Sequence, residues 1–354
     1  MTIKGCCPCW TVIRSANHTQ AIETTRDRLQ MAFDHLSIVI VSFNTRLLLR
    51  RCLASIVNNP YHALIAGSAH VGQVSSTAQT KLRCEVIVVD NASDDGSAEM
   101  VEREYPGVIL IRAGENLGFA RGTNLGLRAS SGNPIMLLNP DTEVIGDALP
   151  ALAEYLYSNP RLAAVSPALL FPDGRPQHGA FRFPTLWMSL LDFFPLNHRL
   201  IDSPLNGRYR VPMNGEPFAV DHPLGAAMMI RREALDDVGM LDESFFMYCE
   251  EVDWCLRATK AGWQIYQLPS AKVVHHVGQS TKQFRDAMFV ELHRSRYYLF
   301  SKHYPQIFLK VHRAITRLGI AKEWIKAVWL ARRGLITDDE LGSRLQAYRT
   351  IWRM

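Results

Sequence analysis

Residues 84–97 read CEVIVVDNASDDGS, and this stretch decides the fold that we expect for the chain. Its first six residues are mostly apolar and β-branched, which is typical of a strand buried on both faces of a parallel sheet. From Asp90 onward the residues are Asp, Asn, Ser and Gly, which end the strand in a turn and cap the helix expected over 94–104. The stretch therefore predicts a buried strand, a polar loop and a helix in succession.

The same succession of strand and helix repeats on both sides of this stretch. Four apolar strands alternating with helices within about a hundred residues imply βαβ units and a parallel sheet that helices cover on both faces. Ligands on such sheets bind beyond the carboxyl ends of the strands. The other three strands are expected over 36–42, 108–112 and 134–138, and the helices over 47–57, 118–129 and 147–158.

Polar side chains follow the carboxyl ends of three of these strands, at Asn44, at Asp90 and in the turn Asn139-Pro140-Asp141. A carboxylate at the mouth of a crevice accepts hydrogen bonds from the N–H and O–H groups of a base or a ribose. Asp141 either binds Mg²⁺ or Mn²⁺ across the phosphates of a nucleotide diphosphate or serves only in a turn, and both interpretations stay open. No G-x-G-x-x-G fingerprint follows a strand, which argues against a nicotinamide or flavin enzyme.

The second half of the chain is less regular and holds two further groups of candidate site residues. Glu250, Glu251 and Asp253 begin a helix, where they either complement its dipole, by about 0.3–1 kcal/mol each, or supply a general base. His275 ends a late strand and is either structural or a contact to a metal or phosphate. The elements expected here are strands over 226–230, 264–267 and 272–275 and helices over 232–238 and 249–261.

The composition of the 354-residue chain bounds its class. Hydrophobic residues make up 47% and charged residues 21%, which excludes a disordered or collagen-like chain. The net charge of +5 is too small to indicate nucleic acid, so we expect no nucleic acid partner, but it agrees with anionic ligands or an anionic membrane surface. Because no apolar run reaches the roughly 18–20 residues that cross a bilayer and no signal peptide begins the chain, we expect a cytoplasmic protein, at most one at the inner face of the plasma membrane.

Three segments are expected along the chain. The first is a flexible leader, whose cluster Cys6-Cys7-Pro8-Cys9 either belongs to a disordered tail or marks a metal or redox site. The last is helical, with basic residues among Leu, Tyr, Phe and Trp, so it either lies on an anionic membrane or packs against the rest of the protein. The leader covers 1–35, the catalytic domain 36–285 with an inserted loop over 58–83, and the helical extension 286–354.

The order of these pieces resembles glycosyltransferase family 2, the inverting enzymes with an A-type nucleotide-sugar-binding fold, and its rhamnosyltransferase-like members in particular. Each motif is weak alone, but seven of them in the family's order are a specific signal. The resemblance implies a mostly parallel central sheet flanked by helices, followed by a helical C-terminal extension. It covers about 36–301, and the matching segments are 38–44 (IVIVSFN), 86–97 (VIVVDNASDDGS), 115–126 (ENLGFARGTNLG), 137–142 (LLNPDT), 225–230 (GAAMMI), 245–257 (FFMYCEEVDWCLR) and 275–280 (HHVGQS).

The resemblance implies roles for individual positions. Asp141 and His275 match the family's contacts to a divalent metal ion, Mg²⁺ or Mn²⁺. Glu251 matches the catalytic base that activates the acceptor, with Asp253 or Glu250 as alternatives. The residues that match the nucleotide-sugar site are Ser42, Asn44, Asp90, Asn91, Asn116, Gly118, Arg121, Asn124 and Asn139.

Two positions depart from the family's pattern. Asn139 stands where the Asp-x-Asp motif has its first acid, which implies weaker metal binding or an ion held by Asp141, His275 and the donor's phosphates. Glu251 stands where the family has Asp, which moves the carboxylate by one methylene.

The resemblance also implies the reaction. The expected donor is a nucleotide-diphosphate sugar, a dTDP- or UDP-sugar carrying rhamnose or a related hexose. The expected acceptor is a hydroxyl of a glycan or lipid-linked molecule in cell-surface polysaccharide synthesis, with peripheral membrane contact left open. Two alternatives are a sugar nucleotidyltransferase, which would release pyrophosphate, and a catalytically silent glycan-binding homologue.

Overall fold

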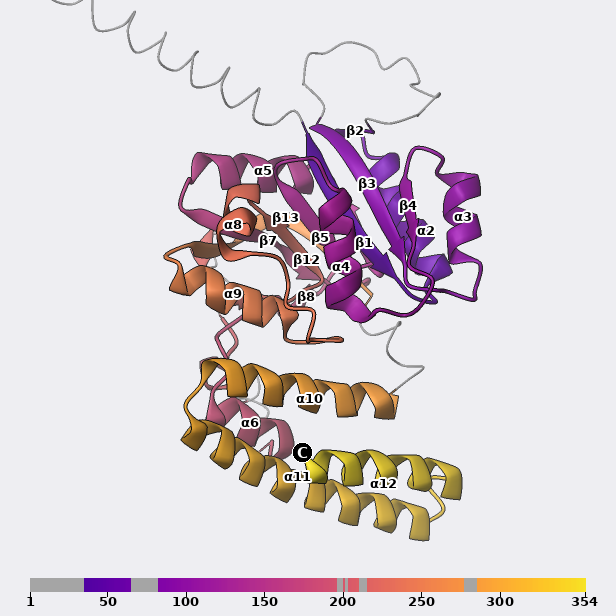
Figure 1. The fold of residues 1–354 in the computed structure, drawn as a ribbon, viewed down its shortest axis with the longest axis vertical. Coiled ribbons are helices and arrows are strands. Elements are labelled where there is room, and N and C mark those ends of the chain that lie inside the picture. Colours follow the sequence, from indigo (N-terminus) through magenta and orange to yellow (C-terminus); the bar gives the residue numbers. More distant parts are fainter. Residues whose placement is uncertain (1–34, 65–81, 196–199, 201–202, 210–214, 277–284) are drawn as a thin grey trace, which may run out of the picture.

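The computed structural model describes residues 35–64, 82–195, 200, 203–209, 215–276 and 285–354, and Figure 1 shows the fold. The cysteine cluster, nearly all of the expected leader and most of the expected inserted loop lie outside the described residues. The elements of the first half are β1 (Leu36–Ser42), α2 (Arg46–Val57), β2 (His62–Leu64), β3 (Leu82–Asp90), α3 (Ser97–Glu104), β4 (Ile109–Arg112), α4 (Gly118–Ala129) and β5 (Ile135–Leu138).

The second half adds antiparallel strands and most of the helices. Its elements are β6 (Thr142–Ile145), α5 (Ala148–Ser158), β7 (Leu162–Leu170), β8 (Pro176–Gln177), β9 (Ala180–Phe181), α6 (Leu186–Phe193), η1 (Pro204–Asn206), β10 (Phe218–Ala219), β11 (His222–Pro223), β12 (Ala227–Ile230), α8 (Arg232–Val238), α9 (Glu250–Lys260), β13 (Gln264–His275), α10 (Arg285–His303), α11 (Gln306–Arg332) and α12 (Asp338–Arg353).

One large sheet forms the centre of the molecule. Within the described residues it has eleven strands, in the order β10-β13-β7-β12-β5-β1-β3-β2, with β4 beside β3, β6 beside β13 and β8 beside β7. β1 pairs in parallel with both β3 and β5, which confirms the predicted βαβ core. The register places Ser42 beside Asp90, so the ends of β1 and β3 meet at one edge. β12 runs antiparallel to β5 and β7, which makes the second half of the sheet mixed.

Helices cover both faces of the sheet because the strand residues alternate between two apolar cores. Ile38 and Val88 belong to the core that α2, α3 and α5 cover. Val39 and Val89 belong to the core that α4, α8, α9 and α10 cover. Both sets of side chains are almost fully buried, which explains the continuous apolar runs in the sequence.

Several predicted boundaries are wrong. The helix expected from residue 94 begins at Ser97, because Gly96 is left-handed (φ 78°) and Asp95 accepts a hydrogen bond from the Ser97 N–H (3.0 Å). The two expected closing strands are one strand, β13, with an irregular register between Leu268 and Lys272. The expected loop 58–83 contains β2 and the start of β3.

Other strands carry no clear pattern in the sequence. β7 lies between β12 and β13 although it contains Pro167, which normally argues against a central strand. Pro167 lies opposite Leu268, where the register of β13 shifts and the ladder is already interrupted. β6 was missed because it directly follows the Asn139-Pro140-Asp141 turn.

The C-terminal helices form a layer of their own. Figure 1 shows α10, α11, α12 and α6 below the sheet, on the side where β1 and β3 end. They share a small core that includes Phe193, Ile320, Tyr348 and Ile351. None of the helices within the described residues is both long enough and apolar enough to cross a bilayer.

Candidate functional site

Hydrogen bonds join the loops that follow β1 and β3. The Asn44 N–H donates to Ser93 Oγ (3.0 Å), and the Asp94 N–H donates back to Asn44 Oδ1 (2.9 Å). Asn44 holds a left-handed backbone (φ 52°), which Asn tolerates better than most residues. The Arg46 N–H at the start of α2 donates to Asp95 Oδ2 (2.7 Å). These contacts make the two loops one rigid rim at the carboxyl edge of the sheet.

Asp90 and Asn91 lie at the bottom of this rim with oxygen atoms that lack partners. Asp90 is buried, and its Oδ2 accepts a hydrogen bond from the Ser93 N–H (3.2 Å). Asn91 donates to the Gly118 carbonyl (2.9 Å). Asp90 Oδ1 and Asn91 Oδ1 are buried and have no partner among the described residues. Since a buried acceptor without a donor is costly, these atoms fit a ligand that supplies N–H or O–H groups.

A cavity of about 290 Å³ opens beside these loops. One wall forms where α4 meets the segment before α9, because the Phe119 N–H donates to the Phe246 carbonyl (2.6 Å). Gly118 is needed there: it is left-handed (φ 78°), and a Cβ on it would lie 2.3 Å from the Phe246 oxygen. The lining residues are Val41, Phe43, Thr45, Asn91, Asn116, Gly118, Phe119, Asn139, Pro140, Phe246, Met247, Ala287 and Met288.

Asp141 and His275 come together through the pairing of β6 with β13, which sets Thr142 opposite His275. The His275 Nε2 atom lies 3.5 Å from Asp141 Oδ1, and both side chains are buried. Gln177 holds the other ring nitrogen of His275, Nδ1, at 3.1 Å, which orients the ring. A carboxylate and an oriented imidazole are suitable ligands for a divalent cation, so the donor set fits such an ion.

His276 faces away from this pair. Its Nε2 atom lies 2.7 Å from Glu143 Oε1, as expected for side chains that alternate along paired strands. Within the described residues no cluster of three or more potential metal-ligating side chains occurs.

Glu250 and Glu251 begin α9 after two left-handed residues, Tyr248 and Cys249. Glu251 lies against Gly225, whose N–H donates to its carboxylate. The next residue, Ala226, accepts a hydrogen bond from the Asn139 N–H (2.9 Å), so Glu251 adjoins the turn that carries Asp141.

Burial changes the acidity of both carboxyl groups. It raises the pKa of Glu251, and burial together with the charge of Glu251 raises the pKa of Glu250 well above its usual value. The Oε2 atoms of both residues are buried without a partner among the described residues. A carboxylate with a raised pKa is a stronger base, which suits the removal of a proton from a hydroxyl group.

Asp253, unlike Glu250 and Glu251, has a partner for each of its carboxylate oxygen atoms. It is fully buried, and its carboxylate binds Arg257 Nε (2.8 Å), Lys302 Nζ (2.7 Å) and His303 Nε2 (2.6 Å). Burial opposes its ionisation, but the hydrogen bonds from Lys302, His303 and Arg257 outweigh burial and lower the pKa of Asp253. Both carboxylate oxygen atoms of Asp253 already have partners, so this residue connects α9 to α10. Asp253 is therefore not available as the base.

Two further candidates lie away from the cavity. Asn124 is buried and binds the backbone of Leu241 in both directions, at 2.8 and 3.1 Å, which ties α4 to the loop before α9. Arg121 is exposed and lies 3.9 Å from Glu243. Neither lines the cavity, because Asn124 is buried against Leu241 and Arg121 faces solvent beside Glu243.

The structure adds residues that the sequence analysis did not assign to the site, although Phe246 and Met247 lie in the segment 245–257 that matches the family. Phe246, Met247 and Met288 line the cavity from segments outside the first βαβ units. Gln177 orients His275 from a strand of two residues. The packing of segments that are distant in the sequence brings these residues to the site.

Asp253→Asn should destabilise the fold by about 3 kcal/mol, since Arg257, Lys302 and His303 lose the buried carboxylate that they bind. The pKa of Asp253 is lowered on folding, so its stabilisation is present above its unfolded pKa of about 3.9 and is lost as the pH falls through the folded value. Urea denaturation at pH 7 should show the loss, and the difference from the unaltered protein should shrink in acid. Asp236→Asn, at an exposed carboxylate of α8, is the control; equal stability of the two variants would contradict the assignment.

The stability change caused by Glu250→Gln should vary with pH in the opposite direction to that caused by Asp253→Asn. The pKa of Glu250 is raised on folding, so its stabilisation is complete below the unfolded value of about 4.3 and is lost as the pH rises through the folded value. The variant should therefore gain stability relative to the unaltered protein between pH 5 and pH 8, as measured by thermal unfolding. A stability difference that is the same at both pH values would show that Glu250 does not resist ionisation.

The open sheet, the polar loops at its carboxyl edge and the adjoining carboxylates define an A-type glycosyltransferase fold. The fold is similar to that of mannosyltransferase PcManGT from Pyrobaculum calidifontis, solved with GDP-Man and Mn²⁺, with a TM-score of 0.51, 17% identity and coverage of 96% of this chain and 93% of that one. It is also similar to GalNAc-T7, solved with UDP, GalNAc and Mn²⁺, with a TM-score of 0.50, 16% identity and coverage of 76% and 51%.

The sequence shows the family. The model of glycosyl transferase family 2 matches residues 37–239, and the chain belongs to this family. The N-acetylglucosaminyl-diphospho-decaprenol L-rhamnosyltransferase of Mycobacterium tuberculosis is 31% identical over 240 residues, which cover 63% of this chain and 76% of the relative. Rhamnosyltransferase WbbL of Escherichia coli is 26% identical over 215 residues, or 58% of this chain and 77% of the relative. The protein is thus a rhamnosyltransferase-like glycosyltransferase.

Proposed function

We propose that the protein transfers rhamnose or a related hexose from a dTDP- or UDP-sugar to a hydroxyl group of a glycan or lipid-linked acceptor, with inversion at the anomeric carbon. The observation that carries the proposal is the convergence of polar groups from separate segments at one edge of the sheet. Asn91, Asn116 and Asn139 line one cavity, Asp141 lies in the same turn as Asn139, and Glu251 adjoins that turn.

The nucleotide would occupy the rim between β1 and β3. The unpaired Oδ1 atoms of Asp90 and Asn91 suit the N–H and O–H groups of a pyrimidine base and a ribose. Ser42 and Asn44 shape the rim next to them through their hydrogen bonds to Thr45 and Ser93.

Asp141 and His275 are the residues that would hold Mg²⁺ or Mn²⁺. Their side chains are 3.5 Å apart, and Gln177 orients the imidazole. A bound divalent cation at this position would stabilise negative charge on the departing diphosphate. Mn²⁺ in the two similar structures supports this proposal.

Glu251 is the proposed base. Its carboxylate takes the proton of the acceptor hydroxyl as the oxygen attacks the anomeric carbon, and the bond to the nucleoside diphosphate breaks on the opposite face. The buried Oε2 atom and the raised pKa support this role, because they keep the carboxylate basic until the proton is transferred. Glu250 remains the alternative base, since it shares the burial and lies next in the chain.

The names of the relatives support the donor and the pathway. Two of them are rhamnosyltransferases, and one carries a diphospho-decaprenol acceptor in its name. We therefore propose a role in the synthesis of a cell-surface polysaccharide, with peripheral contact between the protein and the membrane that holds the acceptor.

A panel of nucleotide sugars, tested by thermal unfolding with Mn²⁺ or Mg²⁺, is the direct experiment. The true donor at about 100 times its Kd should stabilise the protein by about 2.7 kcal/mol, whereas the same nucleotide without sugar or metal should do less. Incubation with acceptors should then release nucleoside diphosphate. Stabilisation by no nucleotide sugar, or binding without consumption of donor with any acceptor, would contradict the proposal.

A further inference from the structure

Helix α11 carries an apolar stripe on its outer face. Its opposite face packs against the neighbouring helices through Leu309, Thr316 and Ile320, which are buried. The stripe follows the spacing of 3.6 residues per turn and runs the length of the helix. Its large members and their exposed fractions are Ile307 (68%), Val311 (36%), Leu318 (65%), Ile325 (71%) and Trp329 (51%).

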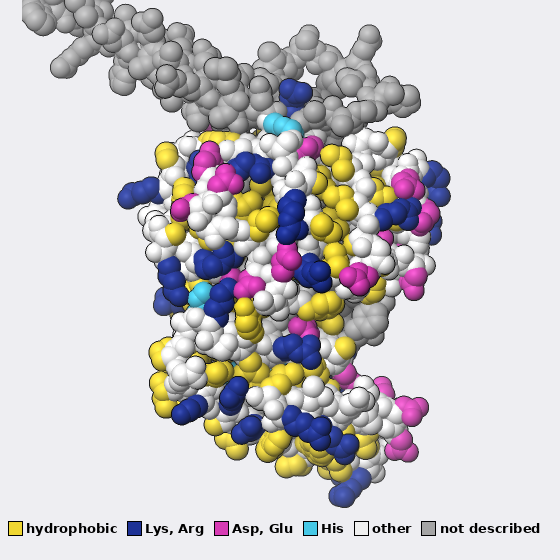
Figure 2. Space-filling model, viewed as in Figure 1, with side chains coloured by type: hydrophobic (Ala, Val, Ile, Leu, Met, Phe, Trp, Pro, Cys, Tyr) yellow, Lys and Arg dark blue, Asp and Glu magenta, His cyan; other side chains and the backbone are white. Residues whose placement is uncertain are grey.

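Basic residues flank the stripe. α11 contains six Lys and Arg residues and a single acid, Glu323, which lies on the packed side of the helix. Residues 286–354 contain thirteen Lys and Arg and six Asp and Glu, a net charge of +7, so the remaining 285 residues have a net charge of −2. Figure 2 shows hydrophobic side chains at the surface of the lower layer, with Lys and Arg side chains among them.

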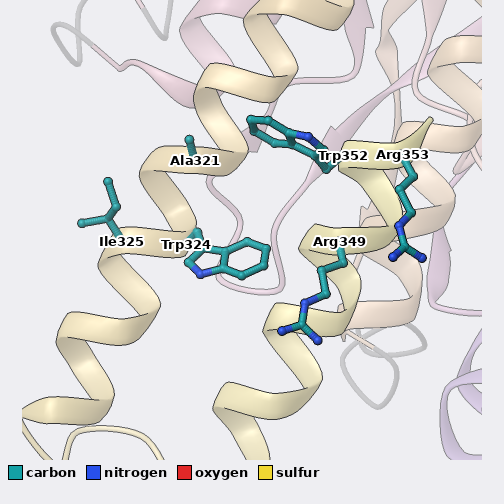
Figure 3. Close-up of a pocket in the computed structure, with 6 residues that line it drawn as sticks. All are labelled: Ala321, Trp324, Ile325, Arg349, Trp352 and Arg353. Carbon is teal, nitrogen blue, oxygen red and sulfur yellow. The ribbon is translucent and has the colours of Figure 1, made fainter.

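A pocket of about 460 Å³ lies beside the stripe, between α11 and α12. Ile325 belongs to both the stripe and the pocket, and Ala321, Trp324 and Trp352 line the pocket beside it (Figure 3). Arg349 and Arg353 of α12 also line the pocket. The Arg349 guanidinium lies over the Trp324 ring, 5.6 Å from its centroid. Apolar walls with tryptophan rings and cations suit the boundary between acyl chains and lipid phosphates.

We propose that α11 lies flat on an anionic lipid bilayer, with this stripe in the acyl boundary and the flanking basic residues at the lipid phosphates. The charge decides the occupant, because an apolar stripe bordered by cations matches an anionic surface better than it matches a second copy of itself. Membrane binding itself does not depend on the proposed function. Only its role rests on that function, which is to bring the cavity for the sugar nucleotide close to a lipid-linked acceptor.

A groove lies between α11 and the cavity that we assign to the sugar nucleotide. This groove, of about 920 Å³, lies among α6, α10, α11 and α12. Lys326 and Leu330 of α11 line it at one side, and Met288 of α10 lines both this groove and the sugar-nucleotide cavity. The groove beside α11 and the cavity therefore share a wall at Met288.

Vesicle co-sedimentation of the full chain tests the proposal. The vesicles are phosphatidylcholine with or without phosphatidylglycerol, at low and high salt. The stripe variant is Leu318→Gln with Ile325→Gln and Trp329→Gln, all at exposed positions. The charge variant is Lys310→Gln with Arg317→Gln and Arg332→Gln. The control combines Ile109→Gln, at an exposed position on β4, with Arg51→Gln on α2.

The unaltered protein and the control should bind the anionic vesicles, and high salt should weaken that binding. The stripe variant should bind at least about a hundredfold more weakly, because three apolar side chains no longer enter the bilayer. The charge variant should lose about fivefold for each basic residue removed. Thermal unfolding should confirm that every variant is folded.

Other results would overturn the proposal. Binding to neither kind of vesicle, or equal binding by all variants, would reject it. A dimer in solution that the stripe variant converts to a monomer, without vesicle binding, would assign the stripe to a second copy. Donor consumption is measured in parallel without lipid: normal consumption without vesicle binding rejects only the docking surface, whereas vesicle binding without consumption rejects only the proposed transferase reaction.

Discussion

Glu251→Gln should lower kcat by roughly 10²–10⁴-fold while donor binding is retained, because the amide keeps the shape of the side chain and cannot accept the acceptor's proton. The carboxylate adjoins Gly225 and the Asn139 turn, and its Oε2 atom has no partner among the described residues. In the unaltered enzyme kcat should rise with pH through the raised pKa of Glu251, since only the ionised form is a base. The variant should lose this rise. Initial rates of nucleoside diphosphate release from pH 5 to 9 measure both effects.

Two other carboxylates serve as comparisons for this result. Glu154→Gln, at an exposed position on α5, should leave kcat unchanged. Glu250→Gln should act mainly on the pH dependence of stability. If Glu250→Gln lowers kcat and Glu251→Gln does not, the base is Glu250 and the assignment of Glu251 is wrong.

Asp141→Asn should weaken the metal-dependent binding of the donor by about 10–100-fold. The carboxylate is one of two oriented side chains that fit a divalent cation, and Asn139 supplies no second acid. Titration of donor binding with Mn²⁺ should therefore shift to higher metal concentration. In the presence of a chelator the variant and the unaltered protein should bind the donor equally. His275→Ala should have an effect in the same direction.

The neighbouring pair of residues provides matched controls. Glu143 of β6 and His276, the residue after β13, lie 2.7 Å apart next to the Asp141–His275 pair. Glu143→Gln and His276→Ala should leave the Mn²⁺ titration unchanged. If the unaltered protein binds and consumes its donor equally well with a chelator present, Asp141 and His275 do not hold a metal ion.

The parallel core was predictable because each step of it is local. An apolar run such as 84–89 forms a stable strand only when side chains on both of its faces are buried. The polar residues that follow the run must then lie where the strand ends. The predicted bounds of α4 and α8 match the structure. Because the carboxyl ends of β1, β3 and β5 share one edge, the sequence also predicted that Asn44, Asp90 and Asn139 would lie near one another.

The rest of the site depends on which face of each helix is packed. Arg121, Asn124 and Asp253 lie in segments that match the family, yet their side chains bind other parts of the fold. Their partners, Glu243, Leu241 and Lys302, come from segments whose approach has no local signal. Gln177 and Met288 reach the site in the same way.

The sequence by itself determined the strand–helix alternation, the polar strand ends and the family, since short-range hydrophobic patterns and turn residues encode them. It also contained the basic and apolar residues of α11, but it left open whether they pack inside or face solvent. Only the tertiary structure decided this, because the free energy of burying a helix face depends on the area that its neighbours cover, and here they cover the face with Leu309 and Ile320 and leave the stripe exposed.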